Sequence, residues 1–137
     1  MPRFVLLYHD CPPGYATSHW DFMLEREGAL STWRLSELPP AWRKDPAVLQ
    51  GEPCELSAER LADHRLAYLE YQGALSGDRG SVSRYDSGTY EVLESHHEAI
   101  AFELSGAILK GRASLAPVDG DFWVLKLDAT RDAEEVH

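Results

Sequence analysis

Two polar residues on one predicted strand have the types and spacing that suit a metal ion. The segment HWDFMLE alternates between an apolar face and a face that carries His19 and Asp21. Residues two apart on a strand lie about 7 Å apart on the same face, so their imidazole and carboxylate can converge on one ion. His9 ends the preceding apolar segment and lies within reach if the two strands are neighbours. The three side chains would then form a two-histidine, one-carboxylate site with open positions, which suits Mn²⁺, Fe²⁺ or Zn²⁺.

Other interpretations of these residues stay open. Two histidines and an aspartate near one hairpin are more often surface or hydrogen-bonded residues than ligands. A rival ligand set is His9, Cys11 and His19, and its thiolate would favour Zn²⁺ over Mn²⁺ because sulfur is a soft ligand. Such a site would be structural if four ligands closed it. Otherwise Cys11 is a small loop residue.

His64 and Tyr68 form a second candidate group. The segment Ala62–Leu69 predicts a helical turn, which would place the two side chains at i and i+4 on one face. There they could present a proton donor and a hydroxyl to an anion. The alternative is that both residues pack and have their polar tips satisfied.

The elements around these residues indicate an all-β fold. Short apolar segments alternate with turn signals, which is typical of an antiparallel meander or barrel, and closing a barrel would remove exposed strand edges. We expect strands at Arg3–Tyr8, His19–Glu25, Ala29–Leu35, Ser81–Tyr85, Thr89–Leu93, Ala99–Leu104, Ala107–Leu115 and Phe122–Leu127, with a weaker alternation over Glu52–Leu61. Turns are predicted at Glu27-Gly28, Ser87-Gly88, Ser105-Gly106 and Asp119-Gly120. One or two short flanking helices are expected, at Ala41–Leu49 and at the His64 turn.

Length and composition predict one ordinary globular domain. A chain of 137 residues can bury a single core, and we place that domain at residues 1–128, followed by a flexible acidic tail at 129–137. No apolar run reaches the roughly 20 residues of a membrane helix, and MPRFVLLYHD lacks the features of a signal peptide. The two cysteines are expected to be reduced thiols. These features predict a cytoplasmic protein without membrane contact.

The charge balance restricts how nucleic acid could be bound. The chain has 13 Lys and Arg residues against 23 Asp and Glu residues, a formal net charge of −10. A protein that grips duplex DNA through many phosphates carries a basic stripe, and the basic residues here are scattered. If nucleic acid is the substrate, we expect only a few phosphates near a chain end to be held.

The order of several motifs resembles the 3'-phosphoesterase domain of bacterial DNA ligase D. The matching segments are FVLLYH, HWDFMLEREGALSTW, ADHRLAYLEYQG, GSVSRYDSGTYEVL, and FELSGAILKGRASL followed by WVLKL, from about Arg3 to Leu127. That family typically has a strand ending in His, an HYDFRLE-like strand, an SWAVPKGP-like segment, an EDHPLDY-like turn and a WDRGTYE-like strand. Several motifs in the same order are more specific than any single one.

The resemblance implies a fold, an activity and roles for residues. It implies an antiparallel β-barrel with short flanking helices, and Mn²⁺-dependent removal of 3'-terminal phosphates or ribonucleotides from DNA ends in end-joining repair. His9, His19 and Asp21 match the metal ligands, with Mn²⁺ expected and Zn²⁺ as the alternative. His64 and Tyr68 match the residues that contact the scissile phosphate. The expected partners are a nucleic-acid 3' end or another phosphate ester, and DNA repair proteins.

The chain departs from the family pattern at several positions. The arginine of HYDFR, a phosphate clamp, is Met23 here, the lysine of VPKG corresponds to Glu37, and the acidic residue of EDH is Ala62. Nine residues separate His9 from His19, more than is usual in the family, and we expect no ligase or polymerase domain. Loss of one such charge stabiliser typically costs about 10²–10³ in rate.

The departures leave two functions from different classes. Arg34, on the strand paired with the metal strand through the hairpin, is the preferred substitute for the missing arginine, ahead of Arg84. With that substitute, the chain is expected to be a metal-dependent phosphoesterase. The alternative is a degenerate metal-binding barrel that serves as a binding or scaffold module, which Met23, Glu37 and the acidic charge favour. Retention of costly polar groups at all the candidate positions favours the enzyme.

Overall fold

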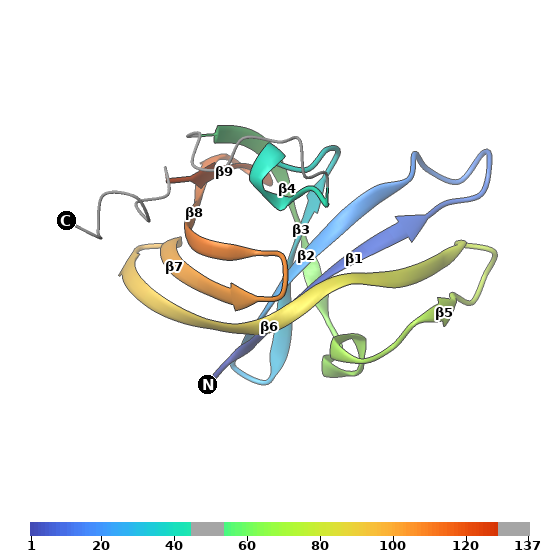
Figure 1. The fold of residues 1–137 in the computed structure, drawn as a ribbon. Coiled ribbons are helices and arrows are strands. Elements are labelled where there is room, and N and C mark those ends of the chain that lie inside the picture. Colours follow the sequence, from blue (N-terminus) through green and yellow to red (C-terminus); the bar gives the residue numbers. More distant parts are fainter. Residues whose placement is uncertain (45–53, 129–137) are drawn as a thin grey trace.

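The chain forms an antiparallel β-barrel in which the first and sixth strands close the ring (Figure 1). The computed structural model describes residues 1–44 and 54–128. Eight strands follow one another around the barrel in the order β1-β2-β3-β4-β9-β8-β7-β6, and β6 pairs with β1. The short β5 pairs only with β6, at the edge of the barrel. Their bounds are β1 Arg3–Asp10, β2 His19–Arg26, β3 Ala29–Leu35, β4 Cys54–His64, β5 Gly73–Ala74, β6 Ser81–His96, β7 Ala99–Gly106, β8 Lys110–Asp119 and β9 Phe122–Leu127.

Local sequence explains the first hairpin. Glu27 and Gly28 both have positive φ, 51° and 83°, which is the backbone of the tight turns that match the twist of paired strands. The turn fixes the register, so Asp21 pairs with Arg34 and Phe22 with Trp33. Alternation along β2 therefore sends Trp20, Phe22 and Leu24 into the barrel, and His19, Asp21 and Met23 to the outside.

Two groups of apolar side chains pack on opposite faces of the first three strands. The inner cluster fills the barrel and comes from strands all round the ring; its largest members include Phe4, Phe22, Trp33, Trp42, Tyr90 and Phe102. The outer cluster lies on the other face and consists of Val5, Leu7, Met23, Leu30, Leu69 and Val82. Strand β1 is thus buried on both faces, as its continuous apolar run predicts.

The all-β prediction is confirmed, and the short flanking helices are 3₁₀ turns. Within the described residues there is no α-helix, only two 3₁₀ turns, η1 at Pro40–Trp42 and η2 at Leu66–Leu69. Of the helix expected at Ala41–Leu49, the part from residue 45 onward lies outside the described residues, as does the predicted tail at 129–137. No helix of the described part of the chain is long and apolar enough to span a membrane.

The helical turn expected around His64 is replaced by a longer strand. Strand β4 runs through to His64, which pairs with Leu30 of β3 beyond a bulge in the register. Pairing with β3 satisfies the backbone groups of this segment, and this outweighs the local helical spacing. Tyr68 lies in η2, so the two side chains are not on one α-helix.

The turn expected at Ser87-Gly88 is also wrong. Strand β6 continues through both residues from Ser81 to His96. Gly88 is needed for close approach instead, because a Cβ there would lie 2.2 Å from the carbonyl oxygen of Ser105 on β7. Local sequence does not distinguish a glycine in a turn from a glycine that leaves space for the backbone of a neighbouring strand.

Candidate metal centre and phosphate pocket

One pocket on the outer face of the barrel brings together all six residues that the sequence singles out. It contains about 480 Å³ of space, part of it open to solvent. The six are His9, His19, Asp21, Arg34, His64 and Tyr68; the rest of the lining is Leu7, Tyr15, Met23, Leu61, Leu75, Arg79 and Val82. The outer cluster supplies the apolar floor of this pocket through Leu7, Met23 and Val82.

His9 and His19 face each other across β1 and β2. They are direct partners in the antiparallel register, and their ring centroids are 4.8 Å apart. The intervening Pro-Gly loop closes through a hydrogen bond from the Cys11 backbone N–H to Ser18 Oγ, 2.9 Å long. The extra residues between the two histidines therefore lie in the loop, and the histidines still pair.

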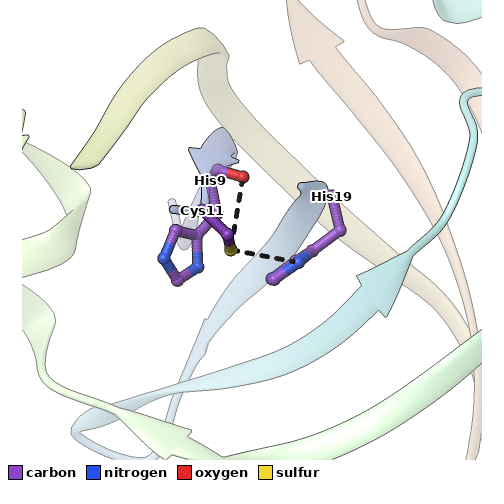
Figure 2. A group of neighbouring side chains, drawn as sticks. All are labelled: His9, Cys11 and His19. Atoms are coloured by element: carbon purple, nitrogen blue, oxygen red, sulfur yellow. Dashed lines mark hydrogen bonds between the residues drawn. The ribbon is translucent and has the colours of Figure 1, made fainter. Parts of the chain in front are cut away.

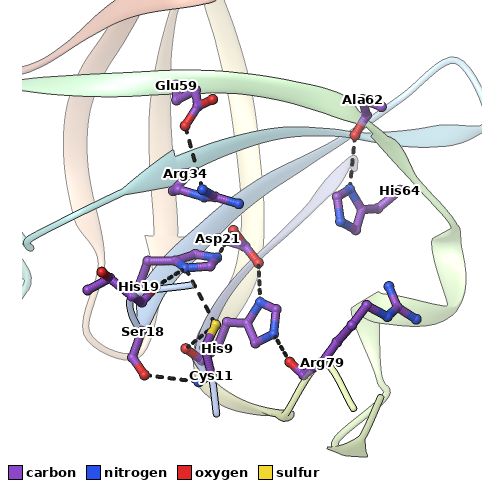
Figure 3. Close-up of polar contacts among 11 residues, drawn as sticks. His9, Cys11, Ser18, His19, Asp21, Arg34, Glu59, Ala62, His64 and Arg79 are labelled. Atoms are coloured by element: carbon purple, nitrogen blue, oxygen red, sulfur yellow. Dashed lines mark hydrogen bonds and ion pairs between the residues drawn. The ribbon is translucent and has the colours of Figure 1, made fainter. Parts of the chain in front are cut away.

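Asp21 lies between the two imidazoles (Figure 3). Its Oδ1 is 3.3 Å from His19 Nε2 and its Oδ2 is 3.7 Å from His9 Nδ1. The Asp21 side chain is only 6% exposed, and its Oδ1 has no hydrogen-bond donor among the described residues unless His19 Nε2, 3.3 Å away, is protonated. A buried carboxylate oxygen without a partner is costly, and a bound cation would remove that cost.

Two backbone carbonyls fix which nitrogen of each histidine is available. His9 Nε2 lies 2.7 Å from the carbonyl oxygen of Arg79, and His19 Nδ1 lies 2.8 Å from that of Thr17. A carbonyl only accepts, so these two nitrogens carry the protons in the neutral rings. The lone pairs of His9 Nδ1 and His19 Nε2 are then directed toward Asp21. Histidine ligands of metal ions usually donate their other N–H in this way.

Asp21 and the Thr17 carbonyl act on the pKa of His19 in the opposite direction to burial. Burial acts to lower the pKa of His19, but the hydrogen bond to Asp21, the Thr17 carbonyl and the negative charge of Asp21 together outweigh it. The pKa of His19 is therefore raised above its ordinary value, although the charge of Arg34 opposes this.

Cys11 adds a thiol beside the two histidines (Figure 2). His9, Cys11 and His19 each offer a ligand atom within 4.8 Å of the others, close enough to hold a metal ion. The Sγ atom lies 4.0 Å from His19 Nδ1 and 3.8 Å from the His9 carbonyl oxygen. Burial raises the pKa of the Cys11 thiol, and the charges of Asp21 and Asp10 act in the same direction while that of Arg34 opposes them. The thiol is thus neutral at pH 7 unless an ion binds it.

His64 and Tyr68 meet at the other side of the pocket although no helix joins them. Their rings are 5.5 Å apart in an edge-to-face arrangement. His64 Nδ1 lies 3.0 Å from the Ala62 carbonyl oxygen, which makes Nδ1 the protonated nitrogen of the neutral ring. Only Nε2 of His64 then remains for contact with a ligand.

Arg34 lines the pocket beside Asp21. It is the cross-strand partner of Asp21, and its Nη1 lies 3.7 Å from Glu59 Oε1. Its Nε is buried without a hydrogen-bond partner in the described part of the chain. Arg84, the other arginine considered, does not line the pocket and donates to the Glu70 carbonyl at 3.2 Å.

Sequence reasoning missed two polar members of the pocket, Tyr15 and Arg79. Tyr15 lies in the Pro-Gly loop, and its ring is 6.3 Å from that of His9. Arg79 precedes β6 and contributes a backbone carbonyl, a group that every residue carries and that no sequence motif reveals. Met23, at the position of the family's arginine, is 1% exposed and belongs to the outer cluster, whereas Glu37 is exposed.

The chain is similar to known proteins along most of its length. A family model for the DNA ligase D 3'-phosphoesterase domain matches residues 9–116. The chain is 33% identical over 117 residues to the multifunctional non-homologous end joining protein LigD of Mycobacterium bovis, and 29% identical over 118 residues to that of Pseudomonas aeruginosa. These matches cover 77% and 80% of this chain but only 14% and 12% of the relatives, so the chain spans a small part of their length. The chain belongs to the DNA ligase D 3'-phosphoesterase domain family.

Proposed function

We propose that this protein is a metal-dependent 3'-phosphoesterase that removes a 3'-phosphate or a 3'-ribonucleotide from DNA ends. The observation that carries the proposal is the buried Asp21 carboxylate, whose Oδ1 lies 3.3 Å from His19 Nε2 and whose Oδ2 lies 3.7 Å from His9 Nδ1. Family membership gives the substrate class. End-joining repair, DNA repair proteins as partners and a cytoplasmic location belong to the same proposal, because the relatives are end-joining proteins by name.

His9 Nδ1, His19 Nε2 and the Asp21 carboxylate would hold the ion. Two imidazoles and one carboxylate suit Mn²⁺ and leave coordination positions for water and substrate, and Zn²⁺ is the alternative. When bound, a divalent ion there neutralises phosphate charge and lowers the pKa of a water molecule. The carbonyls of Arg79 and Thr17 keep both rings in the ligating orientation.

His64, Tyr68 and Arg34 would contact the phosphate. His64 can present Nε2 and Tyr68 its hydroxyl from the far side of the pocket, where each can hydrogen-bond a phosphate oxygen. The Arg34 guanidinium can supply permanent positive charge from the adjacent strand. The three side chains therefore stabilise charge that develops on phosphorus oxygens in the transition state.

The first test is hydrolysis of DNA oligonucleotides ending in a 3'-phosphate or a 3'-ribonucleotide, with Mn²⁺. We expect product from the native chain and a loss of at least about 10²-fold in Asp21→Asn. Asp119→Asn, an exposed carboxylate at the β8–β9 turn, is the matched control and should retain full activity. Absence of product from folded, Mn²⁺-loaded native protein would refute the proposal.

Met23 favours a second candidate, a binding or scaffold module that has lost catalysis. A buried methionine at the clamp position supplies no charge to a phosphate. The variant Met23→Arg distinguishes the two. If hydrolysis rises by about 10²-fold, the missing arginine limits an otherwise competent site, whereas no hydrolysis in either form supports the module. Met23→Leu controls for repacking of the outer cluster.

A further inference from the structure

We propose that Cys11, His9 and His19 form a second, thiolate-containing position for a soft divalent ion such as Zn²⁺ or Cd²⁺. Because both positions use His9 and His19, an ion in this one excludes Mn²⁺ from the position at Asp21. The inference rests on the proposed function only through these shared histidines. It makes the pocket a site that a soft metal ion would inhibit.

The imidazole of His19 faces two different ligand groups through its two nitrogens. Nε2 lies 3.3 Å from Asp21 Oδ1, and Nδ1 lies 4.0 Å from Cys11 Sγ. Figure 3 shows the carboxylate and the thiol at opposite edges of the ring. One ring cannot direct both nitrogens at one ion, so the carboxylate and the thiolate define separate positions.

The distance between Cys11 and His19 requires little movement for the thiolate position. Zinc–sulfur and zinc–nitrogen bonds of about 2.3 and 2.0 Å place the two ligand atoms roughly 3.5 Å apart in a tetrahedral site. Cys11 Sγ must therefore approach His19 Nδ1 by about 0.5 Å from its present 4.0 Å. Cys11 is half-buried at the start of a loop, where a side-chain rotation can supply this shift.

The proton transfers that accompany ion binding are consistent with an ion occupying one position at a time. When a soft ion binds, the Cys11 thiol releases its proton to solvent, and the proton of His19 moves from Nδ1 to Nε2. Nε2–H can then donate to Asp21 Oδ1, the buried oxygen that otherwise has no partner among the described residues. Asp21 thereby changes from a ligand to the carboxylate that orients a ligating histidine. The cost is the hydrogen bond from Nδ1 to the Thr17 carbonyl.

The class of ion follows from the ligand types. Thiolate and imidazole prefer Zn²⁺ and Cd²⁺, whereas carboxylate, imidazole and water suit Mn²⁺. The thiolate position therefore prefers soft ions, and the carboxylate position prefers Mn²⁺.

Cobalt reports the thiolate directly, since a thiolate–Co²⁺ bond has a charge-transfer absorption in the near ultraviolet. We expect this band when the full-length metal-free protein is titrated with Co²⁺, and its loss in Cys11→Ser and Cys11→Ala. Cys54→Ser is the matched control, because Cys54 begins β4, pairs with Leu127 of β9 and does not belong to the group of His9, Cys11 and His19. Zn²⁺ affinity should fall more than about tenfold without Cys11, since even loss of a ligand's hydrogen-bond partner costs about 10–100-fold. Mn²⁺ affinity should be unchanged.

The reciprocal variant separates the two positions. Asp21→Asn should lose Mn²⁺ binding, measured by electron paramagnetic resonance, and keep the thiolate–Co²⁺ band. Absence of the band in the native protein, its persistence without Cys11, or its loss together with Mn²⁺ binding in Asp21→Asn would each overturn the inference. Failure of the proposed function is distinguishable, because a protein that shows the band but hydrolyses no 3' end keeps this site and loses that activity.

Discussion

At the scale of single residues, the pocket has an apolar residue at position 23 and two arginines elsewhere in its lining. Met23 belongs to the outer cluster and offers no charge, while Arg34 and Arg79 line the pocket from either side. The Arg79 guanidinium donates to Ser76 through Nε at 2.7 Å and Nη2 at 3.1 Å. In the described residues, Arg34 has only the long contact to Glu59 and an unpartnered Nε. A phosphate can therefore bind the Arg34 guanidinium without breaking hydrogen bonds like those that Arg79 makes to Ser76.

Arg34→Ala should weaken phosphate binding and leave metal affinity unchanged. A charge-assisted hydrogen bond contributes about 1.5–3 kcal/mol, so the affinity for a 3'-phosphate oligonucleotide should fall by about tenfold or more. Calorimetric titration with the oligonucleotide and with Mn²⁺ measures both quantities. Arg112→Ala, an exposed arginine on β8, is the control. Equal phosphate affinity in the Arg34 and Arg112 variants would exclude Arg34 from the site.

At the scale of elements, a buried carboxylate organises the connection between β7 and β8. Asp86 of β6 accepts hydrogen bonds from three successive backbone N–H groups, those of Ala107, Ile108 and Leu109, at 3.2, 2.9 and 2.7 Å. Gly106 permits this approach, because a Cβ there would lie 2.5 Å from Asp86 Oδ2. The carboxylate thus ties the connection to the strand that closes the barrel against β1.

Asp86→Asn should lower the free energy of unfolding by about 2–3 kcal/mol, because an amide offers one accepting oxygen and turns two donors toward N–H groups. Urea denaturation measures the loss. The exposed Asp121→Asn serves as the comparison and should change stability by less than about 0.5 kcal/mol. Similar midpoints for the two variants would mean that the turn does not depend on Asp86.

At the scale of the whole molecule, the residues that stabilise the barrel and the residues of the pocket lie on opposite faces of the strands. The inner cluster fills the closed ring, whereas the pocket lies outside it on β1, β2 and β3 and is bounded by η2 and the residues before β6. Phe22 is fully buried in the inner cluster between Trp42 and Phe102, at ring-centroid distances of 5.3 and 5.9 Å. Asp21, its neighbour in sequence, lines the pocket on the other face.

Phe22→Ala should therefore cost about 3–5 kcal/mol of stability through the cavity that it leaves in the barrel. Phe122→Ala at the start of β9, where the side chain is 48% exposed, should cost much less. Chemical denaturation of both variants tests this difference. A small loss at Phe22 would show that the inner cluster is not the main source of stability.

Much of the fold could be predicted because its signals are local. Period-2 alternation placed His19 and Asp21 together on one face of β2, and the positive-φ turn at Glu27-Gly28 brought Arg34 opposite Asp21. The all-β class follows from the same signals. Each depends on residues that are close in sequence, where the backbone geometry of strands and turns leaves few choices.

Only the tertiary structure decided the rest. Whether Gly88 turns the chain or admits β7 depends on a strand that follows it in the sequence, and the strand conformation of His64 depends on pairing with β3. The carbonyl that orients His9 belongs to Arg79, 70 residues away. Backbone acceptors and close approaches carry no side-chain signature. The sequence by itself therefore determined the all-β class, the turn beside the site and the candidate ligands, whereas closure of the barrel decided which atoms of those ligands face one another.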